Sequence, residues 1–257
     1  MSQDALEFFG LRPGRGVGTW SMPVEASVLS GTGALFGGAA LGAAVAVVEQ
    51  VAARPVVWAA IQFVRHVRPP SVLQIEGREL ARGRRASQVS VVARVDGAPV
   101  FTVIATSGER DPALTTRQWA TLPSVLRPDD APPRKVLSRH RGRFMERTQA
   151  RLALTEGERS AIWMRVPSLT PSGATLGIAG DYVPFALRHA VGEGWANHSL
   201  DNTLRVLRAP SDGWILADVT VEGVAGGFGH GRVHLWDEQG QLLGTASQSF
   251  TIRRRPD

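Results

Sequence analysis

The sequence predicts an α+β fold in which one unit, an antiparallel β-sheet around a central helix, occurs twice in tandem. The main observation is a set of motifs that recur in the same order: Trp20 and Pro23 as Trp163 and Pro167, and Arg65-x-x-Arg68-x-Pro70 as Arg205-x-x-Arg208-x-Pro210. A later hairpin recurs too, at Gly97 and Gly240. The arginine motifs are 140 residues apart and the hairpins 143, so two collinear halves fit within the 257 residues.

The first half reads as one strand, one helix and four strands. We expect the first strand at residues 19–24 and the helix at 35–52, closed by Pro55. The apolar run 34–48 is too short for the roughly 20 residues of a membrane span, so this helix is expected to be buried in protein, with no membrane insertion. Its glycines and alanines should let a tightly wrapped sheet approach. Four β-rich runs separated by Pro and Gly turns follow, at residues 56–67, 72–80, 86–95 and 99–106.

The second half repeats this order after a segment rich in Pro, Arg and Asp. We expect a strand at 161–166, a helix at 181–191, and strands at 199–207, 214–222, 229–236 and 242–252. The intervening composition is typical of a linker. The predicted organisation is an N-terminal unit at 1–107, a linker at 108–155 and a C-terminal unit at 156–257.

Composition describes an ordinary globular chain with excess positive charge. The apolar fraction is 43%, the mean hydropathy −0.05, the net charge +6 and the pI about 11.1. The arginines are scattered, and their clusters lack aromatic residues that could stack on bases, so we expect no nucleic-acid partner. The chain has no cysteine, and its N-terminus shows no secretory signal, so a cytoplasmic location is expected.

The order and spacing of several motifs resemble one known family. In the first half they are Phe36-Gly37-Gly38, Phe63-x-Arg65-x-x-Arg68-Pro69 and Gly83-Arg84-Arg85-Ala86-Ser87; in the second they are Gly180-Asp181-Tyr182, Ser199-Leu200-Asp201, Arg208-x-Pro210, Gly213-Trp214 and Ala246-Ser247-Gln248. The chain resembles the type II acyl-CoA thioesterases, which have a double hotdog fold. The resemblance spans nearly the whole chain apart from the linker. It implies an acyl-CoA substrate, no cofactor and a homodimer.

Superposing the halves places polar residues in only one of them. The offsets pair Gly38 with Asp181, Ala59 with Ser199, and Ala105 with Gln248. The resembling family has an Asp at the start of the second-half helix, a Thr or Ser before a Leu/Ile-Asp pair, and a Gln on the final strand, which together hold the hydrolytic water. The resemblance therefore implies that Asp181, Ser199 and Gln248 are catalytic and that the first half has lost its polar site.

Chemistry supports the same trio. Thioester hydrolysis requires an oriented water, a base and donors for the developing oxyanion, which backbone N–H groups at a helix N-terminus can supply. Each residue also has a structural interpretation. Asp181 is a good N-cap for the following helix, Ser199 is an ordinary strand residue, and a buried Gln248 needs partners whatever its role.

Four further residues are candidates for substrate binding. Gly37 and Gly38 open the first helix, and Arg84 and Arg85 could contact the phosphates of coenzyme A, as could the arginine cluster 139–143. Solvated surface charge is an equally good interpretation of these arginines. The histidines lack metal-ligand spacing with carboxylates, so no metal site is expected.

The sequence predicts an enzyme that hydrolyses acyl-CoA to the free acid and coenzyme A. Two alternatives stay open. A hotdog hydratase or dehydratase would use a neighbouring Asp and His, and no such pair stands out. An acyl-CoA-binding protein without turnover would have the same fold but a trio that does not converge.

Overall fold

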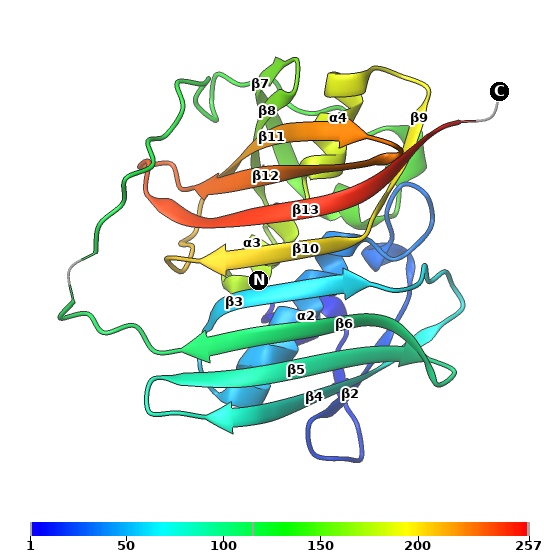
Figure 1. Ribbon diagram of the computed structural model, residues 1–257, viewed down its shortest axis with the longest axis vertical. Coiled ribbons are helices and arrows are strands. Elements are labelled where there is room, and N and C mark those ends of the chain that lie inside the picture. Colours follow the sequence, from blue (N-terminus) through cyan, green and yellow to red (C-terminus); the bar gives the residue numbers. More distant parts are fainter. Residues whose placement is uncertain (1, 115, 256–257) are drawn as a thin grey trace.

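The computed structural model describes residues 2–114 and 116–255, and it consists of one large curved sheet with helices against its concave side (Figure 1). Residues 1, 115 and 256–257, which belong to the predicted domain and linker ranges, lie outside this description. Among the described residues the sheet has 13 strands, ordered β1-β2-β4-β5-β6-β3-β10-β13-β12-β11-β8-β7, with β9 paired to β13. The predicted α+β architecture is confirmed, and the two half-sheets join into one.

The first half contains the predicted strand–helix–four-strand unit. A short helix and strand precede it, α1 (Ala5–Phe9) and β1 (Arg12–Pro13). The unit itself consists of β2 (Thr19–Pro23), α2 (Gly37–Ala52), β3 (Val56–Phe63), β4 (Val72–Arg82), β5 (Ala86–Val95) and β6 (Ala98–Gly108). All of these strands pair antiparallel with their neighbours, and each predicted element is present within a few residues of its expected bounds.

The second half follows the same order with two additional elements. Its elements are β8 (Arg159–Arg165), α3 (Gly173–Ala179), α4 (Val183–Val191), β9 (Trp195–Ser199), β10 (Asp201–Val206), β11 (Ile215–Ala225), β12 (Phe228–Trp236) and β13 (Leu242–Arg254). The helix predicted at 181–191 is confirmed as α4, but a second helix, α3, precedes it and was not predicted. The strand predicted at 199–207 is confirmed as β10, and an additional strand, β9, precedes it and ends just before Leu200.

The helix α2 is almost entirely buried, as its apolar sequence predicts, but its close partner is another helix. A side chain at Gly177 would lie 3.2 Å from the backbone nitrogen of Gly42, and one at Gly42 would lie 3.1 Å from the carbonyl oxygen of Ala174. The small residues therefore let α3 pack backbone to backbone on α2, which also contacts the strands β3, β4, β5 and β6 of the sheet. No helix among the described residues is long and apolar enough to cross a membrane.

The two halves meet where β3 pairs antiparallel with β10 in the middle of the sheet (Figure 1). Equivalent backbone contacts fix how the halves correspond. Arg65 N–H donates to the carbonyl oxygen of Val100, and Arg208 N–H donates to that of Leu243. Both offsets are 143 residues, so Arg65 matches Arg208 rather than Arg205. The predicted pairing of Ala59 with Ser199 is therefore wrong, because the same offset pairs Ala59 with Asn202.

The predicted linker 108–155 is not only a spacer. It contains two short 3₁₀ turns (Ser138–His140 and Phe144–Arg147) and β7 (Gln149–Glu156), which pairs with β8. Phe144 is fully buried, with its ring centroid 5.0 Å from that of Phe36 beside the start of α2. The chain between the halves thus completes the core near the N-terminus of α2. The division into two domains at these boundaries stays a prediction.

Candidate active site

The three predicted polar residues converge. The amide Nε2 of Gln248 donates a hydrogen bond to Asp181 Oδ1 at 2.5 Å and another to Ser199 Oγ at 2.8 Å. Asp181 is 7% exposed and Gln248 1%. Residues 67 and 49 positions apart in sequence therefore form one buried hydrogen-bonded chain, with Gln248 in its centre.

Asp181 owes its position to the break between α3 and α4. The helix α3 ends at Gly180, and α4 begins after Tyr182, which occupies its N-cap without a side-chain hydrogen bond. Asp181 is therefore not the N-cap of α4, and that structural interpretation is wrong. Its carboxylate instead accepts a hydrogen bond from the backbone N–H of Gly38, in the first turn of α2.

Ser199 is positioned by an irregularity in strand pairing. Ser199 pairs with Phe250 and Thr203 pairs with Ser247, so four steps along β9–β10 oppose three steps along β13. The extra residue makes a β-bulge at Leu200, and bulges re-aim neighbouring side chains. Asp201 Oδ1 accepts the backbone N–H of Ser249 at 2.6 Å and so ties the bulge to β13. Ser199 consequently lies diagonally across from Gln248 on the same face.

The predicted Gly37 and Gly38 lie directly at the trio. A β-carbon at Gly37 would stand 2.7 Å from Asp181 Oδ2, closer than such atoms approach in proteins. At Gly38 it would stand 2.7 Å from the Phe36 ring and 3.1 Å from the carbonyl oxygen of Ile178. These glycines admit the carboxylate to the N-terminus of α2, where free backbone N–H groups and the helix dipole favour negative charge. The site thus combines side chains of the second half with a helix terminus of the first.

Burial gives Asp181 an unusual affinity for protons. Loss of solvation raises the pKa of its carboxyl group to about 7, although hydrogen bonding from Gln248, the Gly38 N–H and Asn202 acts in the opposite direction. A carboxylate with a pKa near neutrality accepts protons far more readily than an exposed one and is still ionised in a large fraction of molecules at about pH 7. The environment therefore suits Asp181 to act as a base.

Asn202 is the functional candidate that the sequence interpretation missed. It is fully buried on β10, its Nδ2 donates to the carbonyl oxygen of Gly180 at 3.1 Å, and it lowers the pKa of Asp181. Asn202 thus holds the turn that carries Asp181. The signal was present in the sequence: the offset of 143, which pairs Gly38 with Asp181 and Ala105 with Gln248, also pairs Ala59 with Asn202.

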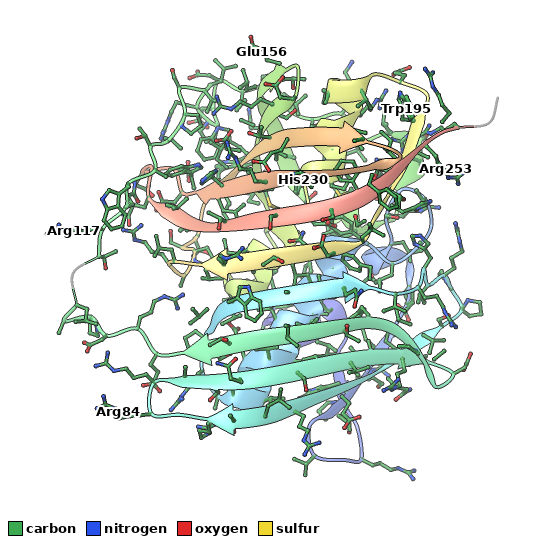
Figure 2. All side chains as sticks on the ribbon, viewed as in Figure 1. Arg84, Arg117, Glu156, Trp195, His230 and Arg253 are labelled. Atoms are coloured by element: carbon green, nitrogen blue, oxygen red, sulfur yellow. The ribbon has the colours of Figure 1, made fainter. Side chains whose placement is uncertain are left out.

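The predicted Arg84 and Arg85 do not gather with the trio. They lie at the turn between β4 and β5, where Arg54 donates to the carbonyl oxygens of Gly83 and Arg84. Arg82 in the same region donates to Ala52, at the C-terminal end of α2. A helix of this length spans about 24 Å, so these arginines stand at the opposite end from Gly37. Figure 2 shows Arg84 at the lower left of the molecule.

The matching positions of the first half carry no polar side chain. Gly38, Ala59 and Ala105 correspond to Asp181, Asn202 and Gln248, and the two alanines are buried and paired with each other across β3 and β6. The described residues therefore form this polar site on one side of the pseudo-symmetric molecule only.

Comparison with protein families agrees with this architecture. Residues 26–108 match the acyl-CoA thioesterase N-terminal domain, and residues 123–252 match the acyl-CoA thioesterase C-terminal domain. No curated protein matches the chain.

Solved structures are similar over nearly the full length. A protein from Novosphingobium aromaticivorans named as a thioesterase is 32% identical, with a TM-score of 0.85 over 95% of this chain and 98% of that one. A hot dog-fold protein from Alicyclobacillus acidocaldarius is 16% identical (TM-score 0.84; 98% of each chain), and an acyl-CoA thioesterase II from Mycobacterium marinum is 18% identical (TM-score 0.78; 98% of each chain). The double hotdog fold is confirmed, and the chain belongs to the type II acyl-CoA thioesterase family.

Proposed function

We propose that the protein hydrolyses acyl-CoA to the free acid and coenzyme A with a water molecule activated by Asp181. The observation that carries the proposal is the buried chain Asp181–Gln248–Ser199 at the N-terminus of α2, with the pKa of its carboxyl group raised to about 7. It combines a base, fixed hydrogen-bonding groups and backbone donors, as hydrolysis of a thioester requires.

In the proposed reaction, water attacks the thioester carbonyl carbon while Asp181 accepts one of its protons. Backbone N–H groups at the start of α2 stabilise the negative charge that develops on the carbonyl oxygen. The tetrahedral intermediate collapses, the carbon–sulfur bond breaks, and the departing thiolate of coenzyme A receives the proton held by Asp181. The products are the carboxylic acid and the thiol.

Ser199 and Gln248 orient the water in this scheme. Both hydrogens of the Gln248 amide are used, one toward Asp181 and one toward Ser199. Because Ser199 Oγ accepts from Gln248, its own hydrogen can be donated to the water or the substrate oxygen. The Gln248 Oε1 atom is buried without a hydrogen-bond partner among the described residues, which leaves an acceptor for a water hydrogen.

Thiol release from a panel of acyl-CoAs of different chain length tests the proposal. Asp181→Ala is expected to lower kcat by about 10²- to 10⁴-fold, the range for loss of a general base. Ser199→Ala is expected to lower it by about tenfold or more, as for one lost hydrogen bond to a charged or reacting group. Asp129→Asn and Ser247→Ala alter exposed residues and serve as matched controls.

Wild-type activity in Asp181→Ala would remove this residue from the mechanism. Saturable binding of acyl-CoA without hydrolysis by the wild type would instead favour the acyl-CoA-binding alternative. The homodimer and the cytoplasmic location stay predictions, and a monomeric mass in solution would contradict the first.

A further inference from the structure

A pocket of about 230 Å³ with basic residues in its lining lies between α4 and β9, beside the candidate active site. Three arginines line it: Arg139 from the segment between the halves, Arg188 from α4, and Arg255 after β13. Trp195, the first residue of β9, forms part of the wall. Asp181, Ser199 and Gln248 are not among the described residues that line this pocket.

The pocket adjoins the trio along both of its walls. Pro184 lines it from α4, three residues after Asp181, and Asn197 lines it from β9, two residues before Ser199. Alternate residues of a strand share a face, so Trp195, Asn197 and Ser199 point to the same side of β9. Four residues of strand span about 13 Å. The near end of the pocket, at Asn197, is therefore about 7 Å along β9 from Ser199, and Trp195 lies at its far end.

The far end carries excess positive charge next to an aromatic ring. Arg188 is paired with Glu193, the only carboxylate among the described lining residues, whereas Arg139 and Arg255 add two further positive charges. The Arg254 guanidinium lies 4.6 Å from the centre of the Trp195 ring. Figure 2 shows Trp195 at the upper right of the molecule, on the side away from Arg84. Arginine forks suit phosphate oxygens, and an indole ring offers a surface for stacking a base.

We propose that this pocket binds the adenosine 3′,5′-bisphosphate end of coenzyme A, with Arg139 and Arg255 contacting phosphate groups and Trp195 lying against the adenine. The proposal rests on the proposed function, because it places the thioester at the trio and leads the pantetheine arm along β9. It also separates two arginine clusters that the sequence alone leaves equivalent: the one near residue 139 is adjacent to the site, and the one at Arg84 and Arg85 is at the opposite end of α2.

Calorimetric titration with adenosine 3′,5′-bisphosphate tests the pocket without requiring turnover. The variant Arg139→Ala/Arg255→Ala is expected to weaken binding by about tenfold or more, the effect of losing one charge-assisted hydrogen bond. The matched control Arg84→Ala/Arg85→Ala, also an exposed arginine pair, is expected to bind as the wild type does. Absence of binding by the wild type, equal binding by the pocket variant, or weakening only in the control would each overturn the proposal.

Hydrolysis assays then separate the pocket from the chemistry. In the pocket variant, KM for acyl-CoA is expected to rise about tenfold with kcat unchanged, whereas KM for acyl-pantetheine, which lacks the nucleotide, is expected to stay the same. An equal rise for both thioesters would overturn the assignment. If the wild type hydrolyses neither thioester, the proposed function is wrong, and the nucleotide titration still decides whether the pocket binds as proposed.

Discussion

The two halves of this protein share one fold but differ at the places where the polar site forms. In the first half, a loop leads directly into the long helix α2 (Gly37–Ala52), whereas in the second half the helix α3 precedes Asp181 and the matching helix α4 ends earlier, at Val191. The strand irregularity beside the site is common to both halves, because β3 has a register shift at Val57, which the offset of 143 pairs with Leu200. The difference between the halves is therefore in the helices that lead to and from the site and in the polar side chains, and the strand bulge is shared.

The first half still contributes to the site. The start of α2 carries no side-chain cap of its own, and the Asp181 carboxylate from the other half takes that place. One unit thus supplies the helix terminus, and the other supplies the titrating group. Substitutions on the two sides of this contact should therefore have unequal effects.

The largest expected effect is on stability, through the buried Asp181. Its pKa is raised to about 7 in the folded protein from an ordinary value of 3.8, so the folded state binds the proton more tightly than the unfolded state. The contribution of Asp181 to the free energy of unfolding is fully present below about pH 4. It decreases by about 4 kcal/mol as the pH rises through about 7. Asp181→Asn should remove that loss.

Denaturant unfolding at about pH 5 and about pH 8, on either side of the raised pKa, measures this effect, with the exposed Asp129→Asn as the control. From the lower to the higher pH, the free energy of unfolding is expected to fall in the wild type and in the control. In Asp181→Asn this fall should be absent. A parallel pH dependence of Asp181→Asn and the wild type would show that Asp181 titrates normally.

The next effect concerns Gln248, which matches Ala105 in the first half. Gln248→Ala removes the two donors that orient Asp181 and Ser199, and kcat is expected to fall by about a hundredfold, as when one oxyanion-type donor is lost. Because Gln248 is buried and is the donor to two polar groups, the melting temperature is also expected to fall, so kcat is measured at a temperature where the variant is folded. Ala105→Ser is the control in the other half and should retain activity. A large loss of activity in this control would contradict the one-sided site.

A smaller loss is expected for Gly37→Ala. The new β-carbon would stand 2.7 Å from Asp181 Oδ2, so the carboxylate must move away from the helix terminus. Misplacement of a reacting group by a fraction of an ångström to about 1 Å lowers rates by about ten- to hundredfold. Steady-state kinetics should show a lower kcat with a helical content equal to that of the wild type by circular dichroism. Undiminished kcat would mean that Asp181 need not contact α2.

The smallest effect is a displacement of the pH profile by Asn202→Leu. Asn202 lowers the pKa of Asp181, so its replacement by an apolar residue of similar size should raise that pKa. The acid limb of kcat/KM, where Asp181 must be ionised, is expected to move to higher pH by up to about one unit. Thr203→Val, at the next position, should leave the limb in place. A limb unmoved in Asn202→Leu would limit Asn202 to a structural role.

Much of this architecture can be predicted from sequence because it is encoded by local periodicity and turns. The buried helix and the strands near 86–95 follow from apolar patterns, and the repeat offset identified Asp181 and Gln248. The bulge at Leu200 and the helix α3 could not be predicted in this way, since the bulge depends on strand register and apolar periodicity did not reveal the helix. The capping box of Ser172 and Thr175 was the local signal for that helix.

The burial of the linker residue Phe144 depends on contacts with α1 and the start of α2 that no local pattern specifies. The same holds for the arginines, because the sequence shows their clusters but not which end of α2 each one faces. Long-range packing, rather than composition, separates the Arg139 region from Arg84 and Arg85.

The central claim is that Asp181 is a base with a pKa near neutrality. Titration of the aspartate side-chain carboxyl carbons by ¹³C NMR, with Asp181→Asn to assign the signal, tests it most directly. The account predicts one signal with a midpoint at about 7, matched by the acid limb of kcat/KM for acyl-CoA hydrolysis. A midpoint near the ordinary aspartate value of about 4 for this signal, or hydrolysis that does not follow it, would contradict the account.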